Sequence, residues 1–410
     1  MIRNLLIVFS FLLVACSSDE PIILSGLDVL EQRDFEIIQG LNVGLITNAT
    51  GINREFQSTI DILHASDKVS LKALFGPEHG VRGDYPAGVD VRTYRDEQTG
   101  LTVYSLYGRT RKPTADMLRN LDALVFDIQD IGVRSYTYLS TLRLAMEAAL
   151  EENIRVIVLD RPNPMGGLRV EGFPAPIEND HFIAPWFVPY VHGMTLGEIA
   201  IMMNEEHWIH PTKKVRLDVI PMKKWQRNML FDDTGLPWVP TSPHIPFSDV
   251  PAYYTATGLL GELDVINIGI GTMLPFRLFG APWVSADIFA DRMNAYNLKG
   301  VFFRPASWRP FYGPHQGQTQ HGVEIILDKS EAEHLFAIQF LLMRTHDALY
   351  PNRKIFAQAQ RSRNQMFDLV AGGIWARELI NESMTLADFK QLEEEKVREF
   401  LGVRERYLLY

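Results

Sequence analysis

The feature that most limits the possible folds is the alternation of short β-rich runs with helical stretches between about residues 26 and 164. The β-rich runs occupy residues 43–48, 71–75, 102–106, 123–128 and 155–160. Helical patterns lie between them at residues 59–65, 114–120 and 138–152. Such alternation is typical of a parallel sheet wrapped by helices. We therefore expect an α/β fold built on a parallel sheet.

Each of these five runs ends on polar or turn-forming residues. The polar segments lie at residues 47–48, 76–79, 107–109, 127–130 and 160–163. Because parallel strands direct their carboxyl ends to one edge of the sheet, these segments should converge there. The pattern predicts one cleft, formed at that edge.

The chain of 410 residues is too long for one ordinary core and indicates two domains. After a capped helix at residues 195–204, a second module is expected to begin with a strand at 215–220. Its other signals are an apolar run at 265–270, β-rich runs at 300–304 and 322–327, and helices at 331–349 and 386–401. We predict a first domain over residues 22–205 and a second, smaller α/β or α+β domain over residues 206–410.

The amino terminus has the pattern of a bacterial lipoprotein signal. Arg3 precedes an apolar run at residues 5–15, and the only cysteine of the chain, Cys16, follows directly. The run is short for a membrane helix, and segment 13–16 resembles a lipobox. An ordinary secretory signal is the alternative. We predict a signal over residues 1–16, with Cys16 as the lipidated first residue of a mature protein that is anchored in the cell envelope and exposed to the periplasm.

Composition and spacing exclude several classes of site. The formal net charge of −10 and the lack of a basic run argue against nucleic-acid binding. His207 and His210 stand three residues apart but have no third ligand at a recognised spacing, so no metal site is predicted. Segment 269–271 has two of the three glycines of a dinucleotide fingerprint, and Pro275 follows where the helix should continue. We therefore expect no cofactor.

Glu78 is the first candidate for chemistry. It follows a strand and lies in a turn framed by Gly76, Gly80 and Gly83, which allow a substrate close to the backbone. A carboxyl group in such a place can act as a general acid or base. The structural alternative, in which Glu78 caps a helix or pairs with Arg82, is equally consistent with the residues alone.

Asp127 and Asp130 form the second candidate cluster. Asp127 ends an apolar strand, where burial favours the neutral acid unless a cation holds it charged, and Arg134 is a candidate partner. For Asp127 a structural ion pair and a catalytic role are both open. Asp130, in the following loop, is better explained by a structural or capping role.

Several ordered motifs resemble those of the exo-β-N-acetylmuramidase family. They occupy residues 44–48, 75–80, 126–134, 159–164, 280–283 and 303–305, and the resemblance runs from about residue 25 to the end. It implies a Rossmann-like domain, a smaller second domain and a cleft between them. It also implies hydrolysis that releases terminal, non-reducing, β-linked N-acetylmuramic acid from peptidoglycan fragments. Glu78 matches the proposed catalytic glutamate of the family, and Asp127 and Asp130 are the candidates for a second carboxylate.

The implied substrate carries a lactyl carboxylate, which a guanidinium group would bind. Arg82, Arg134 and Arg161 lie at the predicted edge, and each is also a possible structural partner of an aspartate. Further predicted substrate contacts are Asn48, His79, Tyr136 and Asn163. Ile270 stands where many members of the family carry an arginine, so substrate recognition on that side is expected to differ.

Two other functions fit the same residues. One is an envelope lipoprotein that binds muramic-acid saccharides without cleaving them, and the other is an amidase or esterase acting on peptidoglycan. The latter lacks a recognisable nucleophile or metal set. Retaining, inverting and substrate-assisted hydrolysis remain open at this point.

Overall fold

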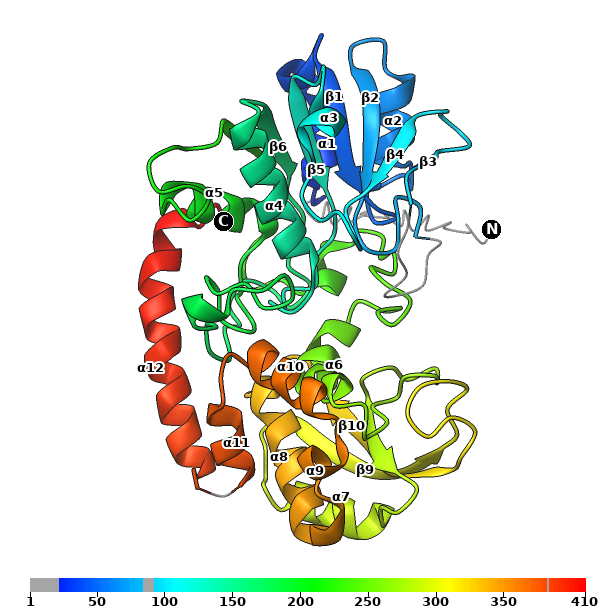
Figure 1. Cartoon of the computed structure of the whole chain (residues 1–410), viewed down its shortest axis with the longest axis vertical. Coiled ribbons are helices and arrows are strands. Elements are labelled where there is room, and N and C mark those ends of the chain that lie inside the picture. The colour runs from blue at the N-terminus through cyan, green and yellow to red at the C-terminus, as the bar shows by residue number, and fades with distance from the viewer. Residues whose placement is uncertain (1–21, 84–91, 382) are drawn as a thin grey trace, which may run out of the picture.

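The computed structural model of the chain describes residues 22–83, 92–381 and 383–410. Within these ranges the chain forms a larger domain with a seven-stranded sheet and a smaller domain with a three-stranded sheet, one above the other in Figure 1. No helix of the described residues combines the length and the hydropathy that crossing a membrane requires. Cys16, the predicted lipidation site, lies outside the described residues.

The larger sheet has the strand order β3-β4-β2-β1-β5-β6-β7. Neighbouring strands are parallel except β3, which pairs antiparallel with β4. Without β3 this is the order of a Rossmann-like sheet, which reverses between β1 and β5. The predicted α/β class with a parallel sheet is confirmed. The strands are β1 (Asn42–Thr47), β2 (Ser70–Gly76), β3 (Tyr94–Arg95), β4 (Thr102–Ser105), β5 (Ala123–Asp127), β6 (Arg155–Leu159) and β7 (Leu217–Ile220).

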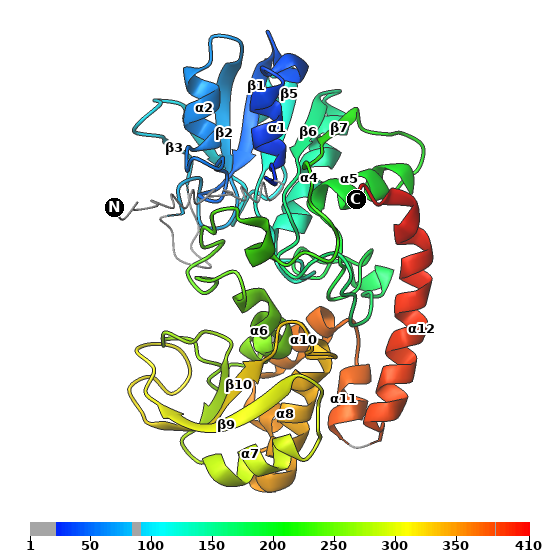
Figure 2. The same cartoon turned by 180° about the vertical axis from the view of Figure 1, so that it is seen from behind.

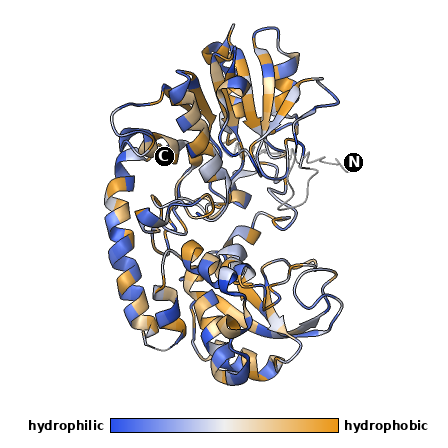
Figure 3. Ribbon diagram, viewed as in Figure 1, coloured by the Kyte–Doolittle hydropathy of each residue, from blue (hydrophilic) through white to orange (hydrophobic). Residues whose placement is uncertain are grey.

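Helices cover both faces of this sheet. On one face α2 (Thr59–Ala65) packs against β1 and β2, and α1 (Gly26–Gln32) packs against β6 and β7. On the other lie α3 (Ala115–Leu118), α4 (Tyr138–Glu151) and α5 (Leu196–Glu205). Every residue of β5 is buried. Val125 packs with the apolar side chains on the face of α1 and α2, and Leu124 and Phe126 pack with those on the face of α3, α4 and α5. A strand covered on both sides needs apolar residues on both, which explains the continuous apolar run and the apolar strands in Figure 3.

The smaller domain is built on β8 (Leu278–Ala281), β9 (Val301–Trp308) and β10 (Gln320–Leu327), with β10 in the middle and antiparallel to both. Its main helix is α8 (Leu335–Leu349), which is buried along most of its length. Its core also takes in Val133 and Tyr190 from the larger domain. The two domains therefore share one apolar core. The other helices are α6 (Val250–Thr257), α7 (Ala286–Asn294), α9 (Ile355–Gln358), α10 (Arg361–Ala371) and α11 (Trp375–Ile380).

The structure corrects several expected elements. The strand expected to open the second module is β7, which pairs with β6 in the larger sheet. The apolar run at 265–270 forms turns with one isolated bridge, because Gly269 and Gly271 turn the backbone at φ 89° and 82°. The short strand β8 was not expected, and α8 begins at Leu335 instead of residue 331. The division of the chain at residue 206 stays a prediction.

The long helix α12 (Leu386–Arg404) connects the two domains. Phe389 is buried in the core of the smaller domain, and Phe400 is buried with α4 and α5 of the larger one. Beyond the helix, the Tyr410 hydroxyl donates a 2.7 Å hydrogen bond to Asp160, which follows β6. Figures 1 and 2 show this helix in red along one side of the molecule. The helix and the shared core together hold the two domains at a fixed distance from each other.

Candidate active site

The candidate site lies at the carboxyl edge of the larger sheet, where the strand order reverses. Thr47 and Asp127 are partners at the ends of β1 and β5, and the Thr47 hydroxyl donates a 2.8 Å hydrogen bond to the Asp127 carbonyl oxygen. β2, beside β1, leads to Glu78, and β4, beside β2, leads to Tyr107. The sheet therefore brings these strand ends to one edge, as predicted. In open α/β sheets, ligands bind outside such an edge at the reversal.

Glu78 is partly exposed and has two hydroxyl neighbours. The Thr137 hydroxyl donates a 3.2 Å hydrogen bond to Glu78 Oε2. Thr137 occupies the N-cap position of α4, yet its side chain makes no hydrogen bond to the helix. The Tyr107 hydroxyl also lies near Glu78, and burial, followed by the negative charge of Glu78, raises the pKa of Tyr107 to about 12. The amino end of α4, which stabilises negative charge, thus faces this carboxylate.

The turn after Glu78 has an unusual backbone. His79 and Gly80 both adopt positive φ, 75° and 74°, and the His79 side chain is buried. A non-glycine residue in this region costs on the order of 1 kcal/mol, and such residues cluster at functional sites. His244, from the segment between β7 and α6, lies near His79. Burial, and to a lesser degree the charge of His79, lowers the pKa of His244.

A group of tyrosines connects the carboxyl edge of the larger sheet to residue 241 and to the smaller domain. The Tyr136 and Tyr138 hydroxyls donate to Thr241, to its Oγ1 at 2.8 Å and to its carbonyl oxygen at 2.7 Å. The Tyr254 hydroxyl, from α6 of the smaller domain, lies 3.1 Å from Ser135 Oγ. Burial raises the pKa of Tyr254, and the negative charges of Glu262, Glu78 and Asp130 add to the effect. The smaller domain therefore reaches the surroundings of Glu78 through Tyr254.

Asp127 is held in a structural ion pair. Its carboxylate accepts hydrogen bonds from Arg161 Nε at 2.5 Å and Arg161 Nη2 at 2.9 Å, and from the Thr59 hydroxyl at 2.5 Å. The Asp127 side chain is fully buried, and that of Arg161 is 8% exposed. The partner is therefore Arg161 and not the expected Arg134. Of the two roles considered for Asp127, this geometry supports the structural one.

Asp130 is buried but only partly satisfied. Its Oδ2 accepts a 2.7 Å hydrogen bond from the Gly132 N–H, while Oδ1 has no hydrogen-bond partner. His192 Nε2, also buried and without a partner, lies 3.8 Å from Asp130 Oδ2. Asp130 therefore closes the turn that follows β5, which fits the capping role that the sequence favoured. Its catalytic role stays a prediction.

The three arginines considered for the lactyl carboxylate are engaged within the protein. Arg82 pairs through two nitrogens with Asp96, at 2.9 and 3.0 Å, and this pairing lowers the pKa of Asp96 to about 2. Arg161 is paired with Asp127 as described. Arg134 is fully buried and donates to the carbonyl oxygens of Phe173, Val188 and Val370.

Arg134 therefore contacts backbone and not solvent, and its predicted role in substrate binding is corrected to a structural one. Its bond to Val370 links the larger domain to α10.

The remaining predicted contacts also have partners in the protein. Asn48 Oδ1 accepts hydrogen bonds from the N–H and the hydroxyl of Thr50. Asn163 accepts one from the Met165 N–H and donates one to the Met194 carbonyl oxygen. Both asparagines are almost fully buried and stabilise turns at the edge. Tyr136 is partly exposed, although its hydroxyl bonds to Thr241. Their roles in substrate binding stay predictions.

Sequence reasoning missed the residues that hold Glu78. Thr137 lies at the start of a predicted helix, and nothing in the sequence indicates its contact with Glu78, which is 59 residues away. The sequence places Tyr107 in the polar segment that follows a strand but does not indicate that it lies near Glu78. Tyr254 and His244 come from segments with little periodicity, so only the packing of the two domains brings them to this edge.

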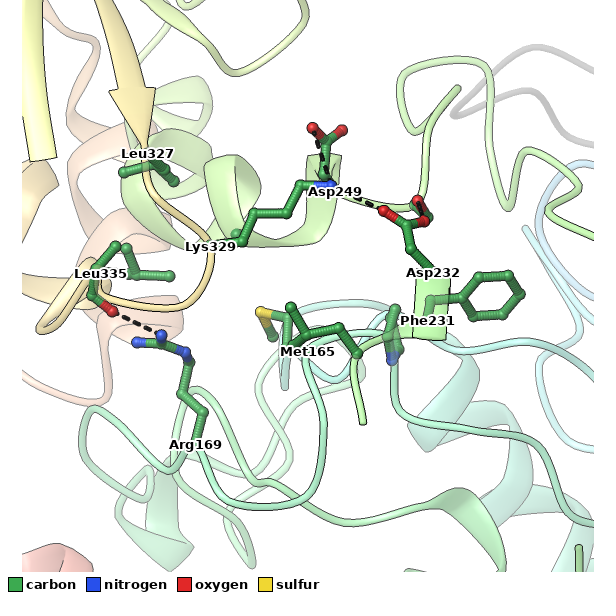
Figure 4. A pocket seen from close by; sticks show the side chains of 13 residues that line it. Met165, Arg169, Phe231, Asp232, Asp249, Leu327, Lys329 and Leu335 are labelled. Carbon is green, nitrogen blue, oxygen red and sulfur yellow. Dashed lines mark hydrogen bonds and ion pairs between the residues drawn. The ribbon is translucent and has the colours of Figure 1, made fainter. Parts of the chain in front are cut away.

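Figure 4 shows a pocket between loops of the two domains. Lys329 Nζ lies 2.8 Å from Asp232 and 3.8 Å from Asp249, and Arg169 donates a 2.6 Å hydrogen bond to the Ala332 carbonyl oxygen. The cations of this pocket are thus paired within the protein. None of the strand-edge residues described above lines it, so it is distinct from the candidate site.

Metal ligation finds no support in the part of the chain that the structure describes, where no group of three or more His, Cys, Asp or Glu side chains could hold an ion. His210 Nδ1, one of the two histidines considered, accepts hydrogen bonds from the Thr212 and Lys213 N–H groups.

Comparison with known proteins matches both domains to one family. The N-terminal model of the exo-β-N-acetylmuramidase NamZ family matches residues 43–249, and the C-terminal model matches residues 252–410. The peptidoglycan β-N-acetylmuramidase NamZ of Bacillus subtilis (strain 168) is 41% identical over 395 residues, which are 96% of this chain and 93% of that protein.

Two solved structures of DUF1343 family proteins from Bacteroides fragilis NCTC 9343 have the same fold. One is 45% identical with a TM-score of 0.89, and the other is 26% identical with a TM-score of 0.75. Each comparison covers 95% of this chain and 99% of the other.

The structural role of Asp127 can be tested by Asp127→Asn. The substitution leaves the buried Arg161 without a charged partner, and removal of one member of a buried pair costs about 3 to 5 kcal/mol. We expect urea denaturation to show a loss of this size, with no such loss for Asp116→Asn, whose side chain is 82% exposed. Unchanged stability together with lost activity would instead assign Asp127 to catalysis.

Proposed function

The chain belongs to the exo-β-N-acetylmuramidase family, and on that premise we propose that Glu78 is the carboxylate with which it cleaves its substrate. It is a peptidoglycan glycoside hydrolase that releases terminal, non-reducing, β-linked N-acetylmuramic acid from peptidoglycan fragments. Both family models match, and they cover nearly the whole chain.

One observation carries the assignment of Glu78. Of the four strand-edge carboxylates considered in the described part of the chain, only Glu78 is partly exposed, whereas Asp127, Asp130 and Asp160 are buried. Asp127 is paired with Arg161, and Asp160 accepts hydrogen bonds from Thr195, Gly197 and Tyr410. A catalytic acid or base must reach the glycosidic oxygen directly or through one water. Among these four, Glu78 meets that condition.

Within this proposal the surroundings of Glu78 orient it. The Thr137 hydroxyl donates to the carboxylate and Tyr107 lies near it, while Gly76 lets the backbone of Gly80 and Val81 pack closely within the turn that carries Glu78. Acting as a general acid, Glu78 would donate a proton to the oxygen of the leaving saccharide as the glycosidic bond breaks, and water would supply the hydroxyl group that the anomeric carbon of the released muramic acid gains. Fixed orientation of such a group is worth several kcal/mol of barrier in enzymes generally.

The sequence also supports a membrane location for this activity. We propose that Cys16 is acylated and anchors the protein to the membrane of the cell envelope, so that the hydrolase acts on muramic-acid saccharides outside the cytoplasm. The lipobox-like segment 13–16 and its single cysteine support this proposal.

Glu78→Gln tests the catalytic assignment. We expect kcat on a chromogenic β-muramide to fall at least about 100-fold, because the amide cannot exchange the proton, while the unfolding midpoint stays unchanged. Glu151→Gln, at the opposite end of α4 and exposed, serves as the matched control and should retain full activity. Full activity of the Glu78→Gln variant would refute the assignment.

Thr137→Val tests the orientation of Glu78. Since the hydroxyl does not cap α4, its loss should leave stability unchanged while kcat falls about tenfold, as expected for one hydrogen bond to a charged group. Thr137→Ser should restore the rate. A matched control is Thr141→Val, whose hydroxyl bonds only to the Thr137 carbonyl oxygen within the helix. Equal rates for Thr137→Val and the unmodified enzyme would show that the contact has no catalytic value.

Cys16→Ser tests the anchor. In cells fed a radiolabelled fatty acid, the unmodified protein should carry the label, and the variant should carry none because its sequence has no cysteine left to be acylated. Ser17→Ala should be labelled like the unmodified protein. Label on the Cys16→Ser variant, or none on the unmodified protein, would contradict the proposal.

A further inference from the structure

Two adjoining loops of the smaller domain expose large apolar side chains beside the candidate site. Phe311 is 83% exposed, Met273 is 84% exposed and Tyr312 is 49% exposed. The loops are joined by a 2.8 Å hydrogen bond from the Phe311 N–H to the Gly271 carbonyl oxygen. We call the surface formed by Met273, Phe311 and Tyr312 the aromatic platform. Clustered exposed apolar side chains usually mark a binding surface.

The platform is built into the fold. Asn267 is fully buried and donates to the carbonyl oxygens of Ile270, at 3.0 Å, and Pro314, at 3.4 Å. It therefore holds one residue of each loop. Its Oδ1 accepts hydrogen bonds from the Trp308 indole and the Gly269 N–H, both at 2.9 Å. Side chains on such fixed loops lose little entropy when a ligand binds.

The glycines of segment 269–271 have a packing reason in this arrangement. A Cβ atom on Gly271 would lie 2.2 Å from the Tyr312 carbonyl oxygen, and its φ is 82°. Only glycine lets the two loops approach this closely. Ile270, which replaces the arginine expected from the family resemblance, is partly buried and packs on the core of the smaller domain. An apolar side chain at this position adds no charge beside the platform.

One contact and one charge interaction lead from the platform toward the turn that carries Glu78. The Tyr312 hydroxyl lies 2.7 Å from His244 Nε2, and the two rings are 5.9 Å apart at an angle of 30°. His244 in turn lies close enough to His79 for their charges to interact, and His79 directly follows Glu78. In Figure 1 the loop between β9 and β10 lies at the edge of the smaller domain, on the same side of the molecule as β2 and β4.

The chemistry of the hairpin loop indicates the ligand. Residues 311–320 contain no Lys, Arg, Asp or Glu, and next to the aromatic side chains they expose Gln316, Gln318 and Thr319. Neutral amides and hydroxyls beside an aromatic face match the hydroxyl groups and the apolar ring faces of neutral sugars. A membrane-binding loop would be expected to carry several basic residues for anionic lipids, and the loop between β9 and β10 has one, Arg309, which donates a 3.0 Å hydrogen bond to the Thr319 hydroxyl.

We propose that the aromatic platform binds the sugar residues beyond the cleaved bond, so that the smaller domain holds the leaving saccharide while Glu78 acts on the terminal muramic acid. The proposal rests on the proposed function of Glu78. It assigns to the smaller domain a preference for longer saccharides, because a substrate that carries only a small leaving group does not reach the platform.

The experiment compares three substrates in the unmodified enzyme and in Phe311→Ala. They are a p-nitrophenyl β-muramide, the disaccharide of muramic acid and N-acetylglucosamine, and the corresponding tetrasaccharide. We expect Phe311→Ala to lower kcat/KM for the tetrasaccharide about tenfold, mainly through KM, because an aromatic contact is lost. Activity on the p-nitrophenyl substrate should stay within about twofold. The matched control is Phe56→Ala, whose ring is 71% exposed on the larger domain and which should change none of the three.

Other outcomes overturn the proposal in distinguishable ways. Equal losses on all three substrates would mean that Phe311 acts on the arrangement of Glu78 and not on the leaving saccharide. No loss on any substrate would mean that the platform does not contact it. Unchanged kinetics with weaker binding to vesicles of phosphatidylethanolamine and phosphatidylglycerol would identify a membrane contact instead. If the unmodified enzyme hydrolyses none of the three, the proposed function itself fails.

Discussion

The buried ion pair between Asp127 and Arg161 holds together the edge at which the strand order reverses. Asp127 ends β5 and Arg161 follows β6, while the same carboxylate accepts a hydrogen bond from Thr59 at the start of α2. Arg161 also donates to the carbonyl oxygen of Ile52, in the loop after β1. One pair thus connects several segments of the edge. Two charges so deeply buried are tolerated because each oxygen of the carboxylate has a donor.

With that edge fixed, the neighbouring strand β2 delivers Glu78 to a place where several elements meet. The amino end of α4 supplies Thr137, β4 leads to Tyr107, and α6 of the smaller domain brings Tyr254 into electrostatic reach. The shared core and α12 keep the smaller domain in position. The site therefore depends on both domains, although its reactive carboxylate comes from the larger one. A glycosidase benefits from this division, because one domain can hold the bond to be cleaved and the other the rest of the saccharide.

Local patterns in the sequence predicted five strands of the larger sheet, β1, β2, β4, β5 and β6, whereas Glu78 was singled out only with the help of the family resemblance. The strands around β5 are buried on both faces, so their apolar runs were unambiguous, and their polar ends marked the edge. Partners were harder to predict, because Arg134 and Arg161 both follow strands and only the packing shows which one meets Asp127. The strand β7 was assigned to the wrong sheet because its pairing with β6 spans a long connection. The platform residues belong to short loops, where periodicity carries no signal.

The central claim, that Glu78 acts on the terminal muramic acid at the carboxyl edge of the larger sheet, is tested most directly by a crystal structure of the Glu78→Gln variant with the bound disaccharide. The account predicts that the glycosidic oxygen lies within about 3 Å of the side chain at position 78, or is joined to it by one water. A disaccharide bound elsewhere, or with its glycosidic oxygen beyond the reach of this side chain, would contradict it.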